Sequence, residues 1–171
     1  LKEMGIDVWV LRGPPQPEAS PAVVVENDEP EFHLCFLNYN SFGICLSLKV
    51  DEDVLSAESK RFCGDVALAI NGGVRRPGIN NLKWPVRGGE NNSHAAAGSV
   101  VLQRFMSLPG LVLVFGRDIT DYIPDLKVNS IEAADNDEPL RLDGRRFLVM
   151  ESIDDICSGV EGKRTLWRRL Q

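Results

Sequence analysis

The sequence predicts an α/β protein with a three-layer α/β/α domain around a mainly parallel central sheet, and with a detached N-terminal peptide. Short apolar runs typical of strands alternate with longer segments of helical periodicity along most of the chain. The run Leu111–Phe115 is apolar on both faces, as a central parallel strand would be. With 171 residues, of which 43% are hydrophobic, the chain can bury one ordinary core.

Local signals place each element in order. The first helix is predicted to start at Asp53 or Ser56, either of which can cap it, and to end near Ile70 before Gly72-Gly73. Helices of this length between strands favour a parallel sheet covered on both sides, although the direction of the second strand stays open. The predicted strands are 32–37, 43–48, 81–84, 111–115 and 146–150, and the other predicted helices are 93–108, a short one near 118–123, and 163–171.

The apolar faces of the two longer helices follow from residue spacing. In the first helix they comprise Leu55, Phe62, Val66 and Ile70, and in the second Ala97, Val101, Phe105 and Leu108. Ser93 is the predicted cap of the second helix.

The first twelve residues form an apolar segment with nothing adjacent in the sequence to bury it. A proline-rich, acidic stretch at 13–30 follows and is predicted to be an extended spacer before an α/β domain at 31–171. One interpretation is a hook that buries an aromatic anchor in a partner's groove. The other is a terminal strand or helix that folds back on its own domain. The candidate partner-binding residues are Met4, Ile6, Val8, Trp9, Leu11 and Arg12.

Composition narrows the classes of function. A net charge of −6 argues against direct nucleic-acid binding as the main task, because duplex affinity depends on Lys and Arg that neutralise phosphates. We expect no membrane span and no signal peptide, and therefore a cytoplasmic location. The four cysteines lie mostly in apolar runs without a C-x-x-C pair, so buried thiols are expected and no metal or cofactor is predicted.

Several motifs resemble the psi subunit of bacterial DNA polymerase III. They are M-G-I-x-x-W-x-L-R at Met4–Arg12, E-S-x-R-x-x-x-D-V-x-x-A-I at Glu58–Ile70, L-K-W-P at Leu82–Pro85, E-P-L-x-L-x-G at Glu138–Gly144, and K-R-x-L-W-x-x-L from Lys163. The likeness covers residues 1–12 and most of 32–171. It implies a noncatalytic clamp-loader adaptor whose N-terminal peptide grips the collar of the motor subunits (gamma and tau). The folded body would hold the chi subunit, which in turn contacts single-strand-binding protein.

The order of elements is also similar to the uracil-DNA glycosylase fold, which supplies a competing enzyme hypothesis. Such glycosylases flip a base into a pocket and use an acidic or amide residue after the first strand and a histidine after the last strand. Here the predicted loop after the last strand, 150–155, contains Glu151 and no histidine, and a carboxylate there would repel a uracil anion. The loop after the first strand offers Asn38 and Asn40. We therefore expect no catalytic residues and favour the adaptor over the enzyme.

The predicted C-terminal helix surrounds Leu166, Trp167 and Leu170 with cations. Cations near a helix C-terminus are expected from the helix dipole alone. The functional alternative is that the apolar face packs on the sheet while the basic face meets an acidic partner.

Overall fold

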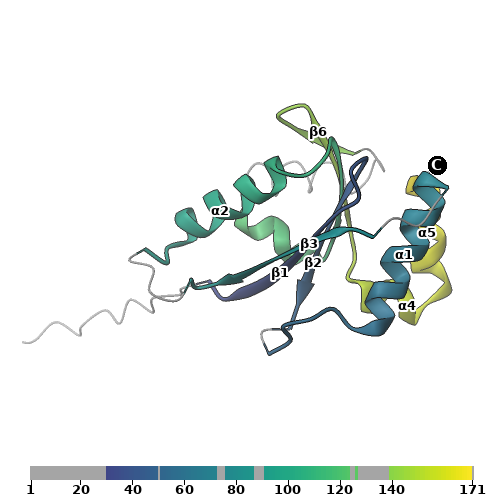
Figure 1. The fold of residues 1–171 in the computed structure, drawn as a ribbon, viewed down its shortest axis with the longest axis horizontal. Coiled ribbons are helices and arrows are strands. Elements are labelled where there is room, and N and C mark those ends of the chain that lie inside the picture. Colours follow the sequence, from purple (N-terminus) through teal and green to yellow (C-terminus); the bar gives the residue numbers. More distant parts are fainter. Residues whose placement is uncertain are drawn as a thin grey trace, which may run out of the picture.

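The computed structural model describes residues 30–49, 51–72, 76–86, 91–123, 126 and 139–170. The candidate hook, and the predicted spacer up to residue 29, lie outside this part of the chain. Within the described ranges the fold is mixed α/β with a six-stranded sheet in the order β3-β1-β2-β4-β6-β5 (Figure 1). The strands are β1 (Phe32–Asn38), β2 (Gly43–Leu48), β3 (Gly78–Trp84), β4 (Leu111–Phe115), β5 (Leu140–Leu142) and β6 (Arg145–Met150).

The prediction of a mainly parallel sheet is wrong. Strand β1 lies antiparallel between β2 and β3, and β5 is antiparallel to β6. Only the β2–β4 and β4–β6 pairs of the described sheet are parallel. The sheet is therefore mixed, and its first strand runs opposite to the central strands β2, β4 and β6.

Two hairpins account for two of the three antiparallel pairs, β1 with β2 and β5 with β6. Only four residues, 39–42, connect β1 to β2, and a parallel crossover needs a dozen or more. The side-chain Oδ1 of Asn38 accepts a hydrogen bond from the backbone N–H of Asn40 at 2.9 Å, and Asn40 has a φ of 70°. The second hairpin joins β5 to β6 through Asp143-Gly144, both with positive φ (47° and 75°), as tight hairpin turns require.

The helices begin and end largely where local signals place them. Ser56 caps the first helix by accepting the Ser59 N–H at 3.0 Å, and Gly72 ends it with a φ of 64°. Ser93 caps the second helix through the Ala96 N–H, as predicted. The helical elements are α1 (Ala57–Asn71), α2 (His94–Met106), the 3₁₀ helix η2 (Arg117–Tyr122), α4 (Ile153–Ser158) and α5 (Val160–Leu170). The predicted C-terminal helix 163–171 corresponds to α5, which begins earlier, whereas α4 and the short strand β5 have no counterpart in the prediction.

Helices pack on both faces of the sheet (Figure 1). Alternate residues of β4 divide between two hydrophobic clusters: Leu113 and Phe115 contact the cluster of α1, α4 and α5, whereas Val112 and Val114 contact the cluster of α2 and η2. The predicted apolar faces of both longer helices are buried or half-buried in these clusters. No helix in the described ranges is both long and apolar enough to cross a membrane.

The predicted burial of the thiols is confirmed for three of the four cysteines. Cys35, Cys45 and Cys63 are buried and Cys157 is half-buried, and all are free thiols. Burial raises the pKa of Cys35 to about 11 and that of Cys63 to about 12. These thiols are therefore protonated, apolar packing groups at neutral pH.

Candidate functional site

After the carboxyl ends of β4 and β6, the chain continues to opposite faces of the sheet. These strands are parallel neighbours, with Phe115 opposite Met150. The chain leaves β4 into η2, whose Ile119 packs in the cluster with α2, and it leaves β6 into α4, whose Ile153 packs in the cluster with α1. Open α/β sheets characteristically bind ligands in the crevice at such a switch point. This edge is therefore the candidate site.

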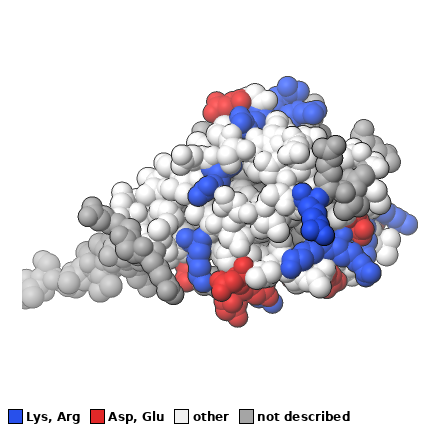
Figure 2. All heavy atoms as spheres, in the orientation of Figure 1, with Lys and Arg blue, Asp and Glu red and all other residues white. Residues whose placement is uncertain are grey.

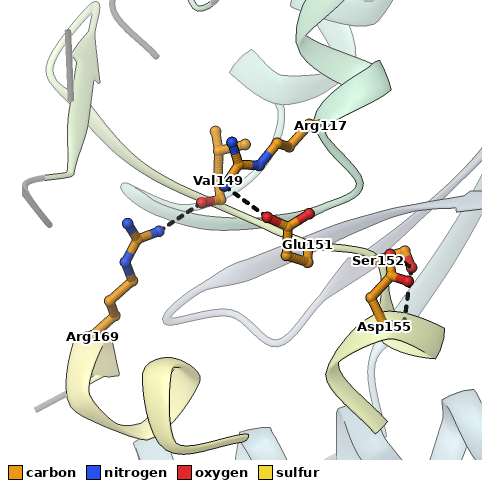
Figure 3. Close-up of polar contacts among 6 residues, drawn as sticks. All are labelled: Arg117, Val149, Glu151, Ser152, Asp155 and Arg169. Carbon is orange, nitrogen blue, oxygen red and sulfur yellow. Dashed lines mark hydrogen bonds and ion pairs between the residues drawn. The ribbon is translucent and has the colours of Figure 1, made fainter. Parts of the chain in front are cut away.

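An ion pair bridges the crevice. Arg117 follows β4 after Gly116, Glu151 follows β6 directly, and Arg117 Nη2 lies 2.7 Å from Glu151 Oε1 (Figure 3). The Gly116 N–H also donates to the Met150 carbonyl at 3.1 Å and so extends the contact between the strands. The side chains of Arg117 and Glu151 are 65% and 53% exposed, so the pair contributes at most about 1 kcal/mol to folding. Its effect is to neutralise the Glu151 carboxylate at the mouth of the crevice.

The polar side chains next to this ion pair form hydrogen bonds within the protein. Ser152 caps α4: its hydroxyl accepts the Asp155 N–H at 3.1 Å and donates to Asp155 Oδ2 at 2.6 Å (Figure 3). From α5, Arg169 Nη1 donates to the Val149 carbonyl at 2.9 Å. The Arg169 contact ties α5 to β6, and the cap gives Ser152 a structural role.

A hollow of about 200 Å³ lies beside the ion pair and under α5. Its lining includes two cations, Arg117 and Arg169, two carboxylates, Glu151 and Glu161, and the hydroxyl of Thr165. Such a lining holds no net charge with which to attract an anionic nucleotide. The lining residues are Arg117, Met150, Glu151, Ile156, Glu161, Gly162, Thr165, Leu166 and Arg169.

The structure separates the residues that the glycosylase hypothesis needs together. Because β1 is antiparallel to β2, Asn38 pairs with Gly43 at the start of β2, whereas Glu151 follows the end of β6. The loop after β1 and the loop after β6 therefore lie at opposite ends of the strands. The predicted loop 150–155 is also shorter than expected, because α4 begins at Ile153 and leaves only Glu151 and Ser152 between strand and helix.

Both histidines belong to secondary structure elements that precede β6, His33 to β1 and His94 to α2. His33 is 3% exposed within β1, and His94 opens α2 with its ring stacked on that of Tyr122 at 6.4 Å between centroids. Neither follows β6.

No protein-family model, no curated protein and no solved structure matches the chain. The site therefore has to be interpreted from its own chemistry.

Sequence reasoning missed Arg117 and Arg169. A usable signal existed for Arg117, because residues directly after parallel strands gather at one edge, and Arg117 and Glu151 each follow a strongly apolar strand. No comparable signal marked Arg169, because its contact with Val149 joins positions 20 residues apart through the packing of α5.

Proposed function

We propose that this protein is a noncatalytic adaptor of the bacterial DNA polymerase III clamp loader. In this proposal residues 1–12 bind the motor subunits, the folded body binds the chi subunit, and chi links the assembly to single-strand-binding protein. The support from sequence is the ordered set of motifs that resemble the psi subunit, beginning with Met4–Arg12.

The observation that favours an adaptor over a glycosylase is the place of β1, three strands away from β6, together with its direction. Asn38 is three register positions from Cys35, and Cys35 aligns across β2 and β4 with Met150. Strand rise and strand spacing then put Asn38 roughly 17 Å from Met150. A glycosylase needs its two catalytic groups within contact of one flipped base. The described body does not bring these two groups together.

The side chains exposed on α5, the C-terminal helix, support the proposal that the folded body binds a partner. Leu166 is 1% exposed and packs against the core, whereas the adjacent Trp167 is 38% exposed among cations. An exposed tryptophan beside charged groups is a common anchor in protein interfaces. This arrangement matches the alternative in which the apolar face packs inward and the basic face meets a partner.

The test of the adaptor assignment is copurification of the tagged, full-length protein from its own cells, with the bound proteins identified by mass. We expect both motor subunits and chi in stoichiometric amounts. Washing with increasing salt should release chi before it releases the motor subunits, because the body's exposed helix is cationic whereas the hook is mainly apolar. Recovery of neither partner would contradict the assignment.

The enzyme alternative makes a separate prediction. We expect the purified protein to release no uracil from single-stranded or duplex DNA above a buffer control, because Glu151 is paired with Arg117 and lies across the sheet from Asn38. A gel assay of abasic-site formation measures this directly. Uracil release that persists through purification and is lost in Asn38→Ala or Asn40→Ala would favour the glycosylase.

A further inference from the structure

One edge of the sheet is open. Strand β3 is the first in the strand order and, of the described strands, it pairs only with β1 (Figure 1). A strand paired on one side leaves a row of backbone N–H and C=O groups that can pair with another extended chain. Edge strands commonly carry charges or proline that discourage such pairing, whereas β3 has Lys83 as its only charged residue and contains no proline. Its first four residues, 78–81, are exposed, so this part of the edge is accessible.

A hollow of about 230 Å³ lies at the start of the accessible edge. It lies on the α2 face of the sheet, because Asn80 of β3 pairs with Phe36 of β1, which packs in the cluster with α2. Phe36 and Leu108 give the hollow an apolar part, and the amides of Asn38 and Asn80 give it a polar part. An extended peptide paired with β3 would therefore have the hollow beside one of its ends.

The positive charge of the hollow is not balanced. Arg104, in the last turn of α2, is the only charged residue of the described lining, and it is half-buried. Its guanidinium forms no hydrogen bond and no ion pair with the part of the chain that the structure describes. Figure 2 shows the surface over α2 and β3, in the middle of the view, as mostly uncharged, with the carboxylates nearer the margins. The N–H donors of Arg104 are therefore available to an anion.

The carboxyl end of α2 does not oppose an anion in the hollow. Unpaired carbonyls at the end of a helix carry partial negative charge. In α2, however, the Arg104 carbonyl accepts hydrogen bonds from the Ser107 N–H at 3.1 Å and from the Ser107 hydroxyl at 2.7 Å. The guanidinium of Arg145 donates to the carbonyls of Met106 and Leu108. These contacts satisfy the carbonyls and place a second cation at this end of the helix.

We propose that the open edge of β3 and the hollow at its start bind the C-terminal segment of a partner polypeptide. A chain end in this hollow must be the carboxyl end, because Arg104 repels an N-terminal ammonium. The segment therefore runs antiparallel to β3, with its terminal carboxylate at Arg104 and its last side chain in the apolar part of the hollow.

Two known modes of recognition combine in this arrangement. Addition of a strand to an open sheet edge gives affinity through backbone hydrogen bonds, and pockets beside the edge give specificity. A guanidinium holds a carboxylate through charge-assisted hydrogen bonds. The inference goes beyond the proposed function and does not depend on it, because its test uses the protein without motor subunits or chi.

The test uses the full-length protein and labelled eight-residue peptides of alternating serine and valine that end in valine. One peptide has a free C-terminal carboxylate, and the second ends in an amide and is otherwise identical. Fluorescence polarisation should show that the free acid binds about 10-fold more tightly, because only the free acid offers an anion to Arg104. Equal binding of the two peptides, or no binding of the free acid, overturns the proposal.

A third peptide tests the sheet edge. It keeps the free carboxylate but has proline at the third and fourth positions from its C-terminus. Successive N–H groups point to opposite sides of a strand, so one of the two prolines removes a donor to β3. We expect this peptide to bind about 10-fold more weakly than the free acid without proline. If it binds as tightly, the carboxylate alone is recognised and strand addition is wrong.

Arg104→Gln locates the carboxylate. This variant should bind the free acid and the amide alike, whereas loss of folding would abolish binding of both peptides. The matched control is Arg146→Gln, at an exposed position of β6 outside the hollow, and it should keep the 10-fold preference. A preference for the free acid that survives Arg104→Gln contradicts the proposal.

Gly78→Val fills the hollow. A Cβ at Gly78 would meet Asn38 Cβ at 4.0 Å, an ordinary contact, and valine favours strands, so the variant should unfold at no lower temperature than the wild type. It should nevertheless bind the free acid at least 10-fold more weakly. The matched control is Gly159→Val, where the backbone is extended and nothing lies within 4 Å of the added Cβ. Unaltered binding by Gly78→Val overturns the proposal. Sedimentation that shows a dimer abolished by Gly78→Val would identify a second copy as the occupant and overturn it as well.

Discussion

Trp9→Ala is expected, under the proposed adaptor function, to weaken binding to the clamp-loader motor subunits by about 2 kcal/mol or more, roughly 30-fold in Kd. The reason is that Trp9 is the largest apolar group in a twelve-residue segment, and an isolated segment of that length is too short to hold a stable structure. In the hook hypothesis, the affinity of this segment for a partner's groove therefore depends on the side chains that it would bury there. Deleting residues 1–12 should have the same or a larger effect, measured by titration of the full-length protein and of the deletion variant.

Controls distinguish the hook from the folded-back segment. Lys2→Ala lies in the same segment but removes no apolar anchor, so it should leave motor-subunit affinity unchanged within about 2-fold. The affinity for chi should be unaltered by Trp9→Ala, since distant sites without shared partners act additively. A deletion variant that binds the motor subunits as tightly as the intact protein contradicts the hook. A deletion variant whose body unfolds favours the folded-back segment.

Gly98→Ala is expected to destabilise the folded body by about 1–3 kcal/mol, as overpacking of a tight contact does. Gly98 lies in α2 where that helix crosses η2, and a Cβ placed on it would clash with the backbone carbonyl oxygen of Tyr122. Because the clashing atom belongs to the backbone, relief requires α2 to move away from η2. Thermal or denaturant unfolding of the full-length variant measures the loss.

Gly64→Ala is the matched control, and its effect should have the opposite sign. Gly64 is also inside a helix, α1, but nothing lies within 4 Å of the position that its Cβ would occupy. Alanine there should stabilise the protein by about 0.5–1 kcal/mol through its higher helix propensity. Equal effects of the two substitutions would mean that α2 does not approach η2 closely.

Most elements could be predicted because their signals are local. Ser56 and Ser93 cap the helices that they precede, and Gly72 adopts the positive φ that ends α1. The predicted strand Leu111–Phe115 coincides with β4. Caps, turns and hydrophobic periodicity act within a few residues, so a single sequence carries them.

Two local signals were present but not used. The four residues between β1 and β2 are too few for a parallel crossover, and Asp143-Gly144 between Leu142 and Arg145 is a strong hairpin signal. Using them would have predicted both antiparallel hairpins. The insertion of β1 between β2 and β3, by contrast, could not be predicted in this way, because β3 returns only after α1 and its pairing is decided by long-range contacts.

The sequence by itself determined where most helices and strands lie, with α4 and β5 as the exceptions. It also determined which faces of the two longer helices are buried and that three of the cysteines are buried thiols. Only the tertiary structure decided the order and direction of the strands, and with them which loops meet. Arg117 and Glu151 lie in contact because β4 and β6 are parallel neighbours, and Asn38 lies at the opposite edge because β1 is antiparallel to them. The physical reason is range, because caps and periodicity act over one or two turns of chain. The pairing of β2 with β4 instead joins residues 69 positions apart, such as Gly43 and Val112, and the cluster in which α1 packs with α5 joins residues about 100 positions apart.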